Sequence, residues 1–203
     1  MKKMCIKIKN PVLITLLTTL LGLILVGQLA AQTFNTLYNF NGNGDGDEPL
    51  GDLLLLGNTL YGTTYFGGAS WGSGGTGEGY GTVFAVNTDG TGATILYSFT
   101  DGGDGGHPRA GVVLAGGKLI GAANDGGAGG LEYISPGTLF SLNPDGTGIA
   151  TLYSFTPLLN GTSNADGALP VQRLSAVGSY LYGATTRGGD FGLGTLFRIN
   201  VGW

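Results

Sequence analysis

One stretch of the chain occurs twice almost unchanged. Residues 81–99 read GTVFAVNTDGTGATILYSF, and residues 137–155 read GTLFSLNPDGTGIATLYSF. In each copy an alternating apolar run, an Asp-Gly turn and a run rich in β-branched and aromatic residues follow one another. This order predicts a strand, a tight turn and a second strand. The chain is therefore a repeat protein built from hairpins.

Three landmarks recur in a fixed order and define the repeat. An Asp-Gly-x-x-Pro turn precedes a Leu-Tyr-Gly-like strand, which precedes a Gly-Thr-x-Phe strand. Their copies begin at Asp45, Asp104 and Asp166, at Leu60, Leu119 and Leu181, and at Gly81, Gly137 and Gly194. An apolar run after the turn and the closing Leu-Tyr-Ser-Phe run complete four short strands per repeat. The pattern predicts an all-β fold of antiparallel, four-stranded repeats resembling the blades of a β-propeller.

The number of repeats does not decide whether the blades form a closed ring. The repeats cover about 41–99, 100–155 and 156–203, and the third contains no closing run, whereas residues 33–40 hold an orphan copy of it. Borrowing this strand into the last blade would hide both sheet edges. Three blades are fewer than the four to eight of closed propellers. The alternatives are an open arc, a homodimeric ring of six blades, and a degenerate fragment of a longer repeat protein.

The first 31 residues have the layout of a secretory signal peptide. Lysines precede an uncharged apolar run, and small residues follow it at Ala30 and Ala31. The run is short for a membrane span, so an uncleaved anchor is the second alternative. We expect residues 32–203 to form a secreted β-repeat domain, extracellular or periplasmic, with no membrane contact after cleavage.

Composition narrows the chemistry of the exported part. The single cysteine, Cys5, lies in the expected signal segment, which excludes disulfides and thiol catalysis from residues 32–203. Four of the nine basic residues also precede residue 32, whereas all thirteen acidic residues follow it. An acidic surface without a basic patch excludes nucleic acid as a partner. The remaining partners are an unknown protein or carbohydrate, or a second copy of the chain.

The combined landmarks resemble the GloVer tandem repeat, a family of exported bacterial proteins. The resemblance rests on Tyr-Ser-Phe, Asp-Gly-x-x-Pro, Leu-Tyr-Gly-Thr-Thr, a Gly-Gly loop and Gly-Thr-x-Phe, in three copies that cover residues 32–203. It implies secretion and a repeat architecture. It implies no reaction and no catalytic residues.

The loop after the orphan strand has the spacing of a calcium loop. Side-chain oxygens recur at alternate positions, a glycine stands at position six and a carboxylate at position twelve. The candidate calcium ligands are Asn41, Asn43, Asp45, Asp47 and Asp52. Asp and Asn are also the residues that turns favour, so turn chemistry is the competing interpretation. No other cofactor is predicted.

Two aromatic residues flank a glycine-rich insertion in the first repeat. Residues 72–77 match a dinucleotide fingerprint by letter, but a strand follows where a helix would be needed. Trp71 and Tyr80 are the candidate ligand-binding residues, since exposed rings beside such a loop could stack on a sugar. Local packing of both rings is the competing interpretation.

No catalytic motif is present, so we expect a non-catalytic module for binding or surface structure. The single histidine, His107, has Asp101, Asp104 and Arg109 near it in sequence. It occupies a position that varies between repeats. The alternative is a propeller enzyme acting on polysaccharide, with carboxylates such as Asp104 or Asp125 gathered around one cleft.

Overall fold

The computed structural model describes most of the chain beyond the expected signal segment. The described residues are 32–42, 44–69, 79–127, 135–159 and 161–203. The chain divides into two compact units, residues 1–35 and 36–203, and every strand belongs to the second unit. The signal segment, Asn43 and Trp71 lie outside the described residues.

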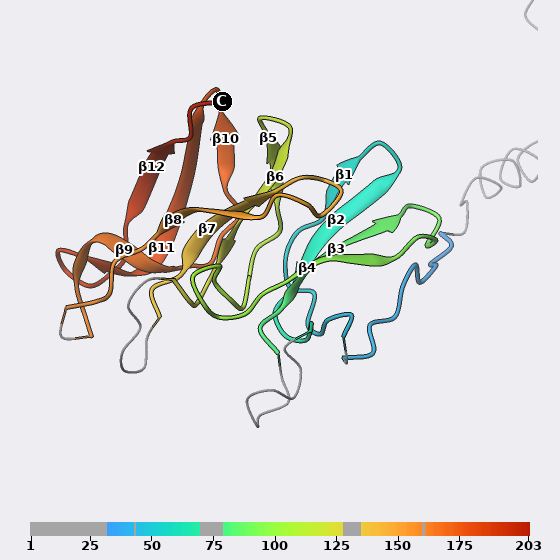
Figure 1. Ribbon diagram of the computed structural model, residues 1–203, viewed down its shortest axis with the longest axis horizontal. Helices are drawn as coiled ribbons and strands as arrows, with labels where there is room; N and C mark the ends of the chain where they lie inside the picture. The colour runs from blue at the N-terminus through green and yellow to red at the C-terminus, as the bar shows by residue number, and fades with distance from the viewer. Residues whose placement is uncertain (1–31, 43, 70–78, 128–134, 160) are drawn as a thin grey trace, which may run out of the picture. The chain divides into compact units, whose positions relative to one another are not determined.

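The all-β prediction is confirmed. Twelve strands form three four-stranded antiparallel sheets, and the described residues contain no helix (Figure 1). Sheet 1 consists of β1 (Leu54–Leu56), β2 (Thr59–Thr64), β3 (Thr82–Asn87) and β4 (Thr94–Ser98). Sheet 2 consists of β5 (Val113–Ala115), β6 (Lys118–Ala123), β7 (Thr138–Leu142) and β8 (Ala150–Ser154). Sheet 3 consists of β9 (Asn164–Pro170), β10 (Ser175–Val177), β11 (Tyr180–Gly189) and β12 (Leu196–Asn200).

Sheets 1 and 2 repeat one another down to the register. Val83 on β3 lies opposite Tyr97 on β4, and Leu139 on β7 lies opposite Tyr153 on β8. The register shifts directly after both pairs, at the same point of each hairpin. The bulge therefore belongs to the repeat rather than to one copy.

Sheet 3 departs from this order. Its fourth strand is β9, which contains the third Asp-Gly-x-x-Pro turn and pairs with the extended end of β11. The first two copies of that turn contribute only isolated bridges, Asp47 to Phe66 and Gly106 to Asp125. Strand β12 pairs with β11, and no other described strand lies beside it. No described strand of sheet 3 takes the position that β4 and β8 occupy in sheets 1 and 2.

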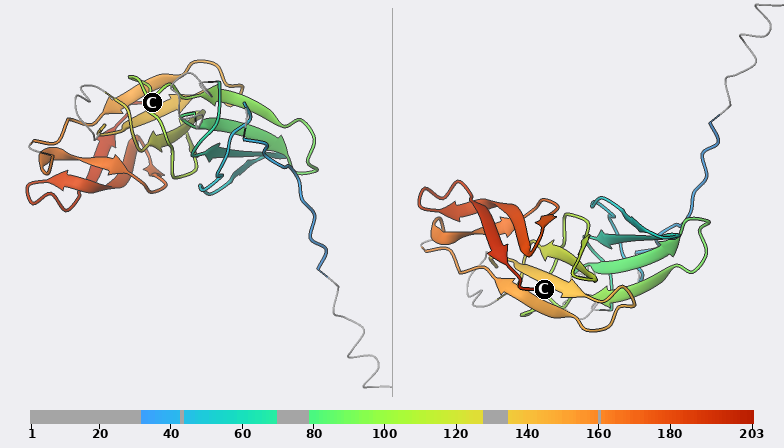
Figure 2. Two further views of the ribbon diagram at one scale, coloured as in Figure 1. Left: turned by 90° about the horizontal axis from the view of Figure 1, so that it is seen from below. Right: turned by 90° about the horizontal axis from the view of Figure 1, so that it is seen from above.

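The core runs between neighbouring sheets. One buried cluster joins Tyr61 and Val83 of sheet 1 to Leu119 and Phe140 of sheet 2. A second joins sheet 2 to Leu174 and Leu181 of the third repeat. Sheet 2 accordingly lies between sheets 1 and 3, as both views in Figure 2 show. Each repeat buries its apolar face against the next repeat in sequence.

The expected closing strand at 33–40 forms no strand among the described residues. Its Phe40 ring packs against Phe84 of β3 with centroids 5.1 Å apart. Phe99 and Phe140 pack in the same way at 5.0 Å, although Phe99 belongs to the preceding repeat. Phe40 thus takes the place of a phenylalanine from a preceding repeat.

In the part of the chain that the structure describes, no helix has the length and apolarity to cross a membrane.

Candidate functional site

The aspartate of each Asp-Gly-x-x-Pro turn is held by the closing run that precedes it and by the residue after that run. In the second repeat, Tyr97 Oη donates to Asp104 Oδ2 at 2.9 Å, and the backbone N–H of Thr100 donates to the same oxygen at 2.9 Å. Thr100 Oγ1 donates to Asp104 Oδ1 at 2.5 Å. Both carboxylate oxygens are thereby used within the turn. Asp104 joins the closing run of one repeat to the start of the next.

The third repeat contains the same arrangement. Tyr153 Oη donates to Asp166 Oδ2 at 2.8 Å, and the backbone N–H of Thr156 donates to that oxygen at 2.9 Å. Burial raises the pKa of Asp166, but the hydrogen bonds from Thr156 and Tyr153 outweigh it and leave the pKa below its ordinary value. Burial and the neighbouring aspartate raise the pKa of both Tyr97 and Tyr153 to about 12.

The first copy of this turn is the predicted calcium loop. Tyr38 Oη donates to Asp45 Oδ2 at 2.8 Å, and the backbone N–H of Asn41 donates to the same oxygen at 3.1 Å. The structure thus gives Asp45 the tyrosine and backbone contacts of Asp104 and Asp166.

Asp47, a second candidate ligand, accepts the backbone N–H of Glu48 at 2.8 Å, and Asp52 is exposed just before β1. Across the described residues, no three His, Cys, Asp or Glu side chains are arranged to hold a metal ion. Since Asn43 lies outside those residues, calcium binding remains a prediction.

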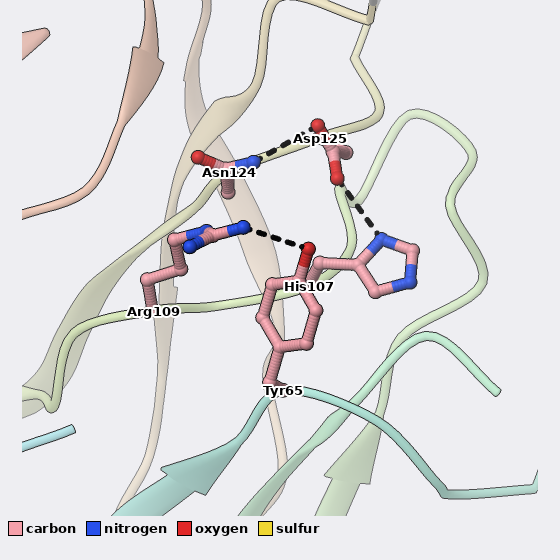
Figure 3. Close-up of polar contacts among 5 residues, drawn as sticks. All are labelled: Tyr65, His107, Arg109, Asn124 and Asp125. Carbon is pink, nitrogen blue, oxygen red and sulfur yellow. Dashed lines mark hydrogen bonds and ion pairs between the residues drawn. The ribbon is translucent and has the colours of Figure 1, made fainter. Parts of the chain in front are cut away.

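His107 lies where the first and second repeats meet (Figure 3). Its φ of 52° is uncommon for a residue other than glycine, and its backbone N–H donates to the carbonyl of Tyr80 at 2.8 Å. Its Nδ1 lies 3.1 Å from Asp125 Oδ2, without the alignment of a hydrogen bond. The contact is therefore an ion pair when the imidazole is protonated.

Three aromatic rings of the first repeat surround the imidazole. Ring centroids lie 5.0 Å from His107 for Tyr65, 5.5 Å for Phe66 and 5.5 Å for Tyr80. Tyr80, one of the two predicted ligand-binding residues, therefore packs against the histidine. Trp71, the other, lies outside the described residues.

Polar groups continue from His107 across the same surface. Arg109 Cζ lies 4.7 Å from the centre of the Tyr65 ring, and Arg109 Nη2 donates to Tyr65 Oη at 3.1 Å. Asn124 Nδ2 donates to Asp125 Oδ1 at 3.0 Å. Figure 3 shows these five side chains gathered from both repeats. We call His107, Arg109, Tyr65, Asn124 and Asp125 the junction cluster.

Asp101 lies beside this cluster and has a positive φ. The equivalent residue of the first repeat, which has a similar conformation, is a glycine. The φ of Asp101 is 59°, and that of the equivalent Gly42 is 77°. Asp101 Oδ1 is buried without a hydrogen-bond partner. Burial raises the pKa of Asp101, His107 opposes the rise, and the carboxylates of Asp125 and Asp104 add to it.

Sequence reasoning found part of the junction cluster. It named His107, Arg109 and Asp125, and it noted Asp101, Asp104 and Arg109 near His107 in sequence, but it did not connect His107 with Asp125. It missed Tyr65 and Asn124. These two residues occupy one repeat position, directly after the Leu-Tyr-Gly-like strand, and that shared position was the available signal.

A scan against models of known protein families finds none that matches the chain. A search of curated proteins also finds no significant match.

Proposed function

We propose that the chain is an exported, non-catalytic β-repeat module that binds a ligand or builds structure outside the cytoplasm. One observation carries the proposal. Asp45, Asp104 and Asp166 each accept a tyrosine hydroxyl and a backbone N–H at equivalent places. Aspartates spread one per repeat and used as turn acceptors serve the architecture, whereas a glycosidase needs two carboxyl groups facing one bond.

The finer architecture is part of this proposal. Three antiparallel four-stranded sheets that pack through equivalent contacts support propeller-like blades. The layout of the first 31 residues supports export. The repeated landmarks support kinship with the GloVer repeats.

The junction cluster is the proposed ligand surface. Arg109 is exposed, and the Asp125 side chain is 28 % exposed while that of His107 is 17 % exposed. The guanidinium of Arg109, the phenol of Tyr65 and the carboxylate of Asp125 offer donors and acceptors at close range, while Asn124 is buried and holds Asp125. This combination suits a hydroxyl-rich carbohydrate or the backbone of an extended peptide.

Calorimetric titration of the full chain with soluble cello-, xylo- and chito-oligosaccharides tests this assignment. We expect a sugar that binds to lose about tenfold in affinity with Arg109→Ala, because one charged hydrogen bond is worth about 1.5–3 kcal/mol. Arg173→Ala, which removes an exposed arginine of the third repeat, should leave binding unchanged. Equal effects of both substitutions would contradict the assignment to the junction cluster.

One observation favours a second candidate, a polysaccharide-acting enzyme. Asp101 and Asp125 both lie close enough to His107 to interact with it electrostatically, and the pKa of Asp101 is raised as a general acid requires. Release of reducing ends from the same oligosaccharides, abolished by Asp125→Asn, would establish this enzyme. No release with the wild-type chain would leave the binding module as the function.

A further inference from the structure

The open side of β12 differs from its counterparts in the other two sheets. Leu196 is 90 % exposed, whereas the equivalent Val83 and Leu139 are fully buried. Val83 and Leu139 are buried in the two clusters that join their sheets to the following repeat. Strands β4 and β8 also pair with β3 and β7, and no described strand does this for β12. Leu196 therefore marks the open side of β12, where β4 and β8 and the following repeat would lie in the other two sheets.

A cavity lies along this open side. It measures about 300 Å³, and its lining includes Phe155, Leu196 and Ile199. The equivalent hollow beside β3 measures about 80 Å³, and residues 93–95 at the start of β4 line it. A strand in the position of β4 would accordingly occupy the larger cavity.

Residues 37–40 have the sequence and the contacts of such a strand. They read Leu-Tyr-Asn-Phe, where residues 96–99 and 152–155 read Leu-Tyr-Ser-Phe. All three runs place their last ring on the Gly-Thr-x-Phe phenylalanine of the following repeat. The ring pairs are Phe40–Phe84 at 5.1 Å, Phe99–Phe140 at 5.0 Å and Phe155–Phe197 at 5.4 Å. The run at 37–40 thus holds the position of a closing strand, but no described strand precedes it for pairing.

The backbone contact that joins successive repeats is also incomplete at both ends. The N–H of His107 donates to Tyr80 O, and the N–H of Leu169 donates to Pro136 O, both at 2.8 Å. In the first repeat the equivalent N–H belongs to Glu48 and donates to Asp47 Oδ1. In the third repeat the equivalent carbonyl belongs to Leu193, which is 86 % exposed.

The apolar contacts between successive repeats show a similar difference between the first repeat and the other two. We call the full set of contacts between two successive repeats a joint. Pro108 is buried against Gly81, and Pro170 is buried against Gly137. The equivalent Pro49 is exposed.

An apolar residue that follows the proline in each repeat differs in exposure in the same way. Leu53 is 52 % exposed, whereas the equivalent Val112 and Leu174 are 0 % and 3 % exposed. The first repeat therefore presents one half of a joint, and the third repeat presents the complementary half.

We propose that two copies of this chain join head to tail through these halves. Residues 36–40 of the second copy pair with the open side of β12 of the first copy, with Leu196 opposite Tyr38, as Val83 lies opposite Tyr97. Pro49 of the second copy then seats on Gly194. Addition of a strand to an open edge gives a specific interface, and a head-to-tail contact forms a closed ring or a filament.

The mass of the full chain in solution, measured by light scattering over a range of concentrations, tests whether copies associate through β12. We expect species larger than one copy, and we expect Leu196→Lys to weaken association about tenfold or more, because one leucine loses its burial. Val177→Lys is the matched control, since Val177 is 64 % exposed on β10, at another edge of the same sheet. It should not change the mass. A wild-type chain of one copy at every concentration, or equal effects of both substitutions, would overturn the proposal.

Cross-linking tests the register independently. In full chains that carry Cys5→Ser, one protein with Tyr38→Cys is mixed with one carrying Leu196→Cys under mild oxidation. Directly opposed residues on paired strands lie about 4.5–5.5 Å apart, within the range of a disulfide. We expect a covalent dimer from this mixture and none when Val177→Cys replaces Leu196→Cys. Equal yields in the two mixtures would show that β12 does not receive residues 36–40 and would overturn the proposal.

Discussion

At the scale of single residues, the fold depends on a tyrosine and an aspartate placed in the same way in each repeat. Tyr97 with Asp104 and Tyr153 with Asp166 join the end of one repeat to the beginning of the next. The tyrosine needs strand spacing to keep its ring beside the core phenylalanine. The aspartate needs the turn to bring its carboxylate back to the hydroxyl. Substitution of either residue should therefore loosen a joint between repeats.

The raised pKa of these tyrosines predicts how stability depends on alkaline pH. A tyrosine with a pKa of about 12 in the folded protein and 10.0 unfolded contributes stability that is fully present below pH 10.0 and is lost as pH rises through 12. We expect the free energy of unfolding in urea to fall from pH 9 to pH 11.5. The double variant Tyr97→Phe/Tyr153→Phe should start lower and fall less. Parallel pH profiles for the wild type and the variant would contradict the role of these hydroxyls.

Asp101 gives a prediction of the opposite kind, a substitution that stabilises. Asp101→Gly removes a buried carboxylate without a hydrogen-bond partner and relieves a positive φ, with an expected gain of about 1 kcal/mol near neutral pH. The raised pKa makes the ionised form unfavourable in the fold, so the wild type recovers stability as pH falls toward 3.8. The gain of Asp101→Gly should shrink over that range. Urea unfolding of both proteins at pH 7 and pH 4 measures it, and a gain that grows at pH 4 would refute this account.

At the scale of elements, the Asp-Gly-x-x-Pro turn packs on a pair of strands, and its glycine determines how closely it can approach them. Gly105 has a φ of 93°, and a Cβ there would lie 2.4 Å from both Ala123 Cβ and Thr138 Oγ1. Thr138 Oγ1 donates to Asp104 O at 3.1 Å. The turn can approach β6 and β7 this closely only because the residue is glycine.

Gly105→Ala should therefore destabilise the protein, by about 2–4 kcal/mol from backbone strain and overpacking together. Gly103→Ala is the control on the same turn, because a Cβ at Gly103 meets no atom within 4 Å. Thermal unfolding by circular dichroism compares the two. Similar melting temperatures for both variants would show that the turn does not lie against β6 and β7.

The sequence predicted those features that depend on residues close together in the chain, and it did not predict those that depend on distant segments. The hairpins and their four-strand repeats were predictable because alternation and Asp-Gly turns act over a few residues. The use of β9 as the fourth strand of sheet 3 was not, since only its pairing with the extended β11 makes that segment a strand. The site divides in the same way. His107 was noticed as a deviation, but its partner Asp125 lies on the loop after β6, and no local rule connects the two.

At the scale of the whole molecule, the repeats stack through one kind of joint that is used twice inside residues 36–203. A Gly-Thr-x-Phe strand of one repeat accepts the closing run of its own repeat and the proline turn of the next. The same halves remain unfilled at β12 and at residues 37–53. In a repeat protein of this kind, each repeat is stabilised by packing on its neighbours. Joining two copies would add one more contact of the kind that stabilises the single chain.

Hydrogen exchange measured by mass spectrometry at low and high protein concentration tests this principle most directly. We predict that amides of β12 (Leu196–Asn200) and of residues 36–40 exchange faster than those of the equivalent β7 and β8 in dilute protein, because β12 is paired on one side only, with β11, and residues 36–40 pair with no described strand. They should become protected as the concentration rises, while β7 and β8 stay unchanged. Exchange of β12 that is as slow as that of β7 in dilute protein, or that does not respond to concentration, would contradict the account.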